Sequence, residues 1–161
     1  MYTKEALLDL HDRSHWSLQK LLVHCTQLSA ESLDRKLEGF GYPTVRLQLH
    51  HALGAEEYWI GVLEGKILAD DNDVEFPTVA TLEAYRRRVA LVTREFLETA
   101  SDDALNTARE MVTWQGVKRR LVPALVVLRP LTHVYQHQGQ VLAMCRLLGM
   151  SGPDGLDFPI D

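Results

Sequence analysis

The chain has 161 residues, a length that corresponds most simply to a single domain over residues 1–161. Its 46% hydrophobic and 24% charged residues are typical of a soluble globular protein. The formal net charge of −5 argues against a nucleic-acid partner, and we expect the short basic runs 86–88 and 118–120 to lie on solvated faces.

The sequence predicts neither a secretion signal nor a membrane span. The N-terminal stretch MYTKEALLDL lacks the apolar centre of a signal peptide, and the longest apolar run, residues 121–128, is too short to cross a bilayer. The two cysteines, Cys25 and Cys145, form no CxxC pair, so no structural disulfide is expected. We therefore expect a cytoplasmic protein with reduced cysteines and no membrane partner.

The first half of the chain contains two segments with the hydrophobic period of an α-helix. The first is expected over residues 3–28, and the glycine-rich stretch 29–43 should connect it to the second. The second helix is expected from Thr44, a suitable N-cap, to Gly65. A polar loop is expected next, over residues 69–77.

The second half contains two more helical segments. One is expected over residues 81–100, with inward side chains at Leu82, Tyr85, Val89, Val92 and Phe96. Residues 109–122 combine β-branched and aromatic residues around a Gln-Gly pair, which predicts a short hairpin or an irregular loop. The last helix is expected over residues 122–149, with a proline in its first turn. Four long helices and little strand predict an all-α, antiparallel four-helix bundle.

Two pairs of histidines are spaced four residues apart. They are His133 and His137 in THVYQHQGQV, and His11 and His15 in HDRSH. Residues with this spacing share one helical face, as they do where one helix supplies two metal ligands. The spacing alone does not choose between the two pairs.

The surroundings favour the pair on the last helix. No charged residue lies between Leu131 and Cys145, so His133 and His137 should point into the bundle. A buried imidazole needs a hydrogen bond or a metal for its nitrogens, and neutral imidazole is the commonest metal ligand in proteins. Two interpretations stay open at this point: a pair of metal ligands, or two satisfied core histidines.

The first helix invites a simpler interpretation. His11 lies in its apolar stripe and His15 at the edge of that stripe, which indicates one core histidine and one boundary histidine. His11 could also approach a metal site as a hydrogen-bond donor to a ligand. His24 has no comparable context, and we expect it at the surface.

A third ligand candidate comes from the second helix, where His50 and His51 are adjacent. A helix points neighbouring residues in different directions, and His50 shares the polar stripe with Arg46. The period therefore predicts that His51 points inward and that His50 is solvated. Together with His133 and His137, His51 would form a face of three nitrogens with an open coordination position, the pattern of a catalytic metal site.

These motifs, in this order, resemble the DinB/YfiT-like superfamily of metal-dependent enzymes. The resemblance covers nearly the whole chain and consists of LHHALGAEEYWIGVL followed by a late HVYQHQGQV. The matching residues are His51, Glu56, Trp59, His133, His137, Gly139 and Gln140.

The resemblance implies one divalent metal ion per chain, zinc or nickel, held by His51, His133 and His137, and frequently a homodimer. The better-understood members are similar to transferases and isomerases that use low-molecular-weight thiols such as bacillithiol, mycothiol or glutathione. One position departs from the family, because Gln138 stands where an arginine is usual. Any role of that arginine in anchoring an anionic group, a partner chain or a neighbouring helix is therefore in doubt here.

Two classes of function follow. In a metal-dependent enzyme, a thiolate would attack a small electrophile in S-transfer or isomerisation, or hydroxide would hydrolyse it. Tyr58, nearly on the side of His51, is a candidate for orienting the substrate; Glu56 is turned away from it, and Cys145 is expected in the core. The alternative class is a non-enzymatic metal- or ligand-binding dimeric bundle, and a purely structural bundle with neutral core histidines is a third interpretation.

Overall fold

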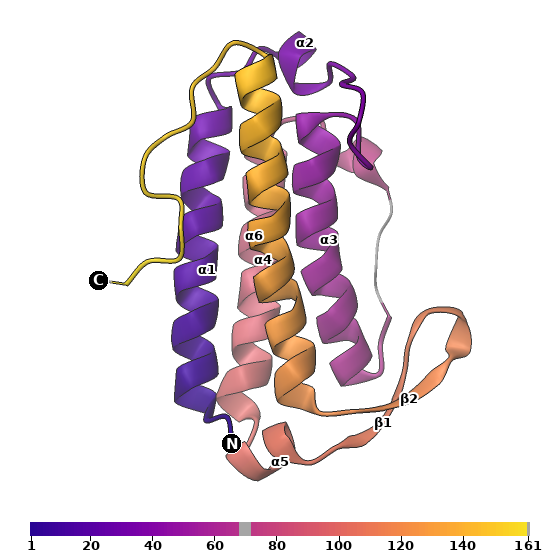
Figure 1. Ribbon diagram of the computed structural model, residues 1–161. Helices are drawn as coiled ribbons and strands as arrows, with labels where there is room; N and C mark the ends of the chain where they lie inside the picture. The colour runs from indigo at the N-terminus through magenta and orange to yellow at the C-terminus, as the bar shows by residue number, and fades with distance from the viewer. Residues whose placement is uncertain (68–71, 161) are drawn as a thin grey trace.

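The computed structural model describes residues 1–67 and 72–160 (Figure 1). Four long helices form a bundle, which confirms the predicted all-α class. The long helices are α1 (Lys4–Cys25), α3 (Val45–Glu64), α4 (Val79–Thr99) and α6 (Pro123–Leu147). The shorter elements are α2 (Ala30–Leu33), η1 (Asp73–Glu75), α5 (Asp102–Asn106), β1 (Arg109–Val112), η2 (Trp114–Gly116) and β2 (Lys118–Leu121).

Each long helix packs against two others: α1 and α3 each contact both α4 and α6. The pairs α3–α6 and α1–α4 are antiparallel, because the start of each helix meets the end of its partner. In Figure 1, α3 and α4 run in one direction along the bundle, and α1 and α6 run in the other. α3 is therefore covered on two sides, and residues next to each other on it face different helices.

The predicted hairpin before the last helix is present. β1 and β2 pair antiparallel, with Glu110 opposite Arg120, and the turn between them contains η2. Figure 1 shows this hairpin projecting beside the end of α3 where that helix finishes. One residue of the hairpin, Trp114, lines a pocket together with residues of α3 and α6.

Local signals explain most helix boundaries. The hydroxyl of Thr44 caps α3 by accepting a hydrogen bond from the backbone N–H of Leu47. α4 begins at Val79 rather than near residue 81, because Thr78 is its N-cap and forms a capping box with Thr81. The connection expected over residues 29–43 contains the short helix α2. In the expected loop 69–77, residues 69–71 lie outside the described part, and η1 occupies Asp73–Glu75.

The inward stripe of α4 differs from the predicted one in its second half. Leu82, Tyr85 and Val89 are buried as expected, but Val92 is 37% exposed and Thr93 is buried instead. After Val89 the stripe continues in steps of four residues, because the helix period is 3.6 rather than 3.5. This drift brings the Thr93 hydroxyl, rather than an apolar side chain, into the centre of the bundle.

Two histidines expected in solvent are buried. His50 is 7% exposed, and its ring lies against Phe76 and Tyr85, because α3 buries its α4-facing side as well as its α6-facing side. His24 is 8% exposed. It lies in the last turn of α1, at the bundle end where the chain crosses through α2 toward α3 (Figure 1). The periodicity of a single helix does not reveal that neighbouring elements bury His50 and His24.

Cys145 lies in the core, as expected from the sequence. Cys25 on α1 and Cys145 on α6 are both free and fully buried in the core. Among the described residues, no helix is long and apolar enough to cross a membrane.

Candidate metal centre

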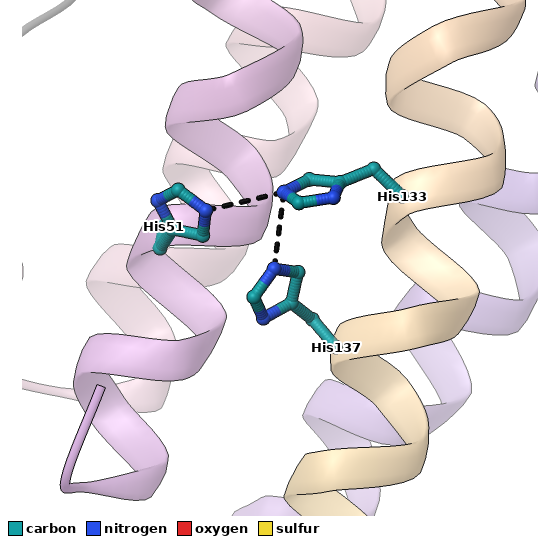
Figure 2. A group of neighbouring side chains, drawn as sticks. All are labelled: His51, His133 and His137. Atoms are coloured by element: carbon teal, nitrogen blue, oxygen red, sulfur yellow. Dashed lines mark hydrogen bonds between the residues drawn. The ribbon is translucent and has the colours of Figure 1, made fainter. Parts of the chain in front are cut away.

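Three histidines from two helices converge between α3 and α6 (Figure 2). His51 on α3 points toward α6, and His133 and His137 on α6 point back toward it. The Nε2 atom of His133 lies 3.1 Å from Nε2 of His51 and 3.0 Å from Nε2 of His137. The antiparallel packing of the two helices thus brings together the three residues selected from the sequence.

The convergence does not make a satisfactory hydrogen-bond network. A neutral imidazole has one N–H and one lone pair, and a single hydrogen on His133 Nε2 cannot point along both short contacts. In a tetrahedral site with metal–nitrogen bonds of about 2.0–2.1 Å, neighbouring nitrogens lie about 3.4 Å apart, close to the separations found here. The arrangement of the three imidazoles therefore suits coordination of a divalent metal ion better than it suits hydrogen bonding among them.

A glutamine orients one of the histidines. The Nδ1–H of His137 donates to Oε1 of Gln48 at 2.6 Å, which leaves the lone pair on the Nε2 atom that faces the other two rings. Gln48 is itself held, because its Nε2 donates to Oε1 of Gln140 and to the backbone carbonyl of Tyr42. The Tyr42 ring also stacks on His51, with ring centroids 4.0 Å apart. Gln48 therefore sets the tautomer and the orientation of His137.

Replacing Gln48 with leucine should lower zinc affinity by about 10- to 100-fold, the usual cost of removing a partner that orients a metal-bound histidine. The measurement is a competition titration against a chromogenic zinc chelator. Gln27→Leu is the control, because Gln27 is an exposed glutamine just after α1 that does not line the pocket. Equal affinities for wild type and Gln48→Leu would contradict the orienting role.

Electrostatics keep two of the histidines, His133 and His137, neutral. Burial, followed by the charges of His133 and His51, lowers the pKa of His137 to about 4. The pKa of His133 is also lowered, by burial first and then by the Arg129 guanidinium. At neutral pH these imidazoles therefore carry the lone pairs that a metal requires.

These pKa values predict that the metal-free protein loses stability in acid. His137 ordinarily titrates near 6.5 but near 4 in the fold, so the unfolded chain binds more protons between those values. The free energy of unfolding should fall by about 2 kcal/mol between pH 7 and pH 5 through this residue. Urea unfolding of chelator-treated protein at both pH values measures the loss. His137→Gln should show a loss smaller by that amount, and equal losses would contradict the prediction.

The histidines lie at a large open pocket of about 970 Å³. His51 and His133 line it, and aromatic side chains from α3 and from the hairpin form much of its wall, namely Tyr58, Trp59 and Trp114. The Tyr58 hydroxyl accepts a hydrogen bond from the backbone N–H of Trp114 at 2.7 Å, which ties the hairpin to α3. Tyr58 therefore lines the same pocket as His51 and His133, and its own hydroxyl hydrogen remains available to a ligand.

A second group of possible ligands lies elsewhere in the bundle. His11 and His15 of α1 and Glu56 of α3 have one ligand atom each within 4.8 Å of one another, and all three are buried. Glu56 is turned away from His51 as predicted, and it is only 1% exposed. The prediction that His15 lies at a boundary is wrong, because the residue is buried. It lies on α1, the helix diagonally opposite α3, and faces Glu56 across the bundle.

Hydrogen bonds from the protein satisfy the carboxylate of this second group. The Glu56 carboxylate accepts from the Thr93 hydroxyl at 2.6 Å, from His15 Nε2 at 2.9 Å and from His11 Nε2 at 3.2 Å. Burial alone would raise the pKa of Glu56, but the charges and hydrogen bonds of the two histidines outweigh it and lower that pKa. The Arg86 guanidinium lies 3.5 Å from His15 Nδ1 and adds positive charge. The carboxylate is thus satisfied without a metal and links α1, α3 and α4.

Gln138, the residue that replaces the usual arginine, has a structural contact. It is buried, and its amide nitrogen donates to the Ser17 hydroxyl and to the backbone carbonyl of Leu156. Ser17 also donates to that carbonyl, at 2.8 Å. The position therefore anchors the C-terminal segment to α1 through neutral hydrogen bonds, and it does not reach the three-histidine pocket.

Fold and site together define a helical bundle with a histidine cluster that could hold a metal ion. The DinB family model matches residues 1–159, so the chain belongs to the DinB family. A DinB-like protein from Bacillus cereus has a similar structure, with a TM-score of 0.77 and 22% identity over 96% of this chain and 99% of that one. A conserved protein from Enterococcus faecalis is similar with a TM-score of 0.66 and 15% identity over 92% and 99% of the two chains. No curated protein matches the chain.

Proposed function

We propose that the chain is a divalent-metal-dependent enzyme that transfers a thiol to a small electrophile or isomerises that electrophile. The observation that carries this proposal is the meeting of three Nε2 atoms, with no adequate hydrogen-bond arrangement, at the wall of an open pocket. His51, His133 and His137 would hold the ion, and zinc and nickel suit three imidazoles. When bound, the ion would lower the pKa of a coordinating thiol or water near neutral pH.

The thiol would come from outside the protein. Within the described ranges, no cysteine lines the pocket, and Cys25 and Cys145 are buried in the core. A low-molecular-weight thiol could enter because the pocket is open to solvent. Tyr58 would orient the substrate through its hydroxyl, and the neighbouring aromatic rings would contact its apolar part.

The test uses zinc-loaded and nickel-loaded protein, glutathione, N-acetylcysteine or 2-mercaptoethanol, and the electrophile 1-chloro-2,4-dinitrobenzene. We expect release of chloride faster than the uncatalysed rate, and loss of that acceleration in His51→Ala. Hydrolysis of a model ester without thiol would instead favour a metal-dependent hydrolase, because water can enter the same open pocket. Metal binding with no turnover in any assay would favour a non-enzymatic binding bundle.

We further propose that the protein is a cytoplasmic homodimer, in keeping with the family resemblance. Light scattering after size-exclusion chromatography should give a mass of about twice 18.3 kDa. A mass of one chain at micromolar concentration would contradict the dimer and would leave the metal site as it is.

A further inference from the structure

One pocket-lining cation, Arg129, has no ion-pair partner among residues 1–67 and 72–160. It lies on α6 one turn before His133, so the two side chains occupy neighbouring positions on the same helical face. Its guanidinium carbon lies 5.0 Å from the centre of the Trp59 ring, which holds the charge against the pocket wall. Arg129 is exposed, so an entering ligand can reach it.

Among the residues that the structure describes, the rest of the pocket does not neutralise this charge. Asp73 also lines the pocket, but its carboxylate already accepts a hydrogen bond from Arg46 Nη1 at 2.9 Å. The histidine cluster contributes neutral imidazoles and no carboxylate, so the charge of a bound divalent ion would add to that of Arg129. The pocket therefore attracts anions.

The spacing of Arg129 and His133 on α6 indicates which kind of anion the pocket would bind. Neighbouring positions one turn apart on a helix have Cβ atoms about 5–6 Å apart, so a single small molecule can contact both side chains. A planar guanidinium binds a carboxylate through two parallel hydrogen bonds. A thiol that carries a carboxylate on a short chain could therefore place its sulfur at the histidines and its carboxylate at Arg129.

We infer that Arg129 is a specificity-determining residue that binds the carboxylate of a small thiol at the three-histidine pocket. This inference rests on the proposed function, because it names the chemical class of the thiol. The apolar rings of Tyr58, Trp59 and Trp114 would cover the carbon chain between the two ends of that ligand.

The experiment compares 3-mercaptopropionate with its uncharged amide, 3-mercaptopropionamide, by isothermal titration of zinc-loaded protein. Wild type should bind the carboxylate about tenfold more tightly than the amide, and Arg129→Gln should lose that preference while its affinity for the amide is unchanged. Arg129→Lys should restore part of the preference, because it returns the charge without the planar fork. Arg119→Gln is the matched control, an exposed arginine on β2 that does not line the pocket.

Elemental analysis of every variant separates failure of the inference from failure of the proposed function. Equal binding of the two thiols by wild type, with a full complement of zinc, would overturn the role of Arg129 and leave the metal-dependent enzyme in place. An equal loss of preference in Arg119→Gln would also overturn it, because a distant charge would then act as strongly. Wild-type protein that takes up no zinc would overturn the proposed function and this inference with it.

Discussion

Replacing His133 and His137 together with alanine should remove the bound metal completely. Wild-type protein purified without a tag and incubated with zinc or nickel should contain about one ion per chain, and the double variant none, because a single imidazole cannot hold a divalent ion against the buffer. Elemental analysis measures both. The variant should still fold, since His133 is only partly buried and the apolar residues around both positions stay in place.

A matched variant locates the metal. His15→Gln alters the second cluster and leaves the three-histidine site intact, so its metal content should equal that of wild type. The opposite result, with metal lost in His15→Gln and kept in the double variant, would place the ion at Glu56. A wild type without metal after incubation would make the segment THVYQHQGQV a polar part of the core, and the enzyme hypothesis would lose its main support.

The ligand candidates were predictable from sequence because helical period and burial act within one helix. The apolar surroundings of His133 and His137 indicate their direction whatever the rest of the fold, and the structure brings them to His51. The same reasoning was wrong for His50, because it assumes one buried face for each helix. α3 packs against both α4 and α6, so His50 on its polar stripe is also covered.

Contacts between helices could not be predicted, because they depend on register. The bond from His137 to Gln48 requires the antiparallel alignment of α3 with α6, and no feature of either helix alone encodes it. A glutamine one turn before His51 was the available signal, and it is weak. Arg129 and Trp59 likewise meet only because the two helices cross at that level. The cluster of His11, His15 and Glu56 is still harder to predict, because its hydrogen bonds depend on the alignment of three helices.

The Glu56 cluster yields the largest expected effect on stability. Replacing Glu56 with alanine should lower the free energy of unfolding by about 3–5 kcal/mol, the cost of breaking a buried charged network by removing one partner. His11, His15 and the Thr93 hydroxyl would keep their donors in a dry interior without the carboxylate that accepts from them. Urea denaturation followed by circular dichroism measures the change.

Two further variants separate a structural cluster from a second metal site. Glu64→Ala, an exposed glutamate on the same helix, should change stability by no more than about 0.5 kcal/mol. Glu56→Gln keeps the shape of the side chain and removes its charge, so it should be destabilised while its metal content stays at the wild-type value. Normal stability with a reduced metal content in Glu56→Gln would mean that the carboxylate is a ligand. The hydrogen bonds that His11, His15 and Thr93 give to Glu56 would then describe only the metal-free state of that site.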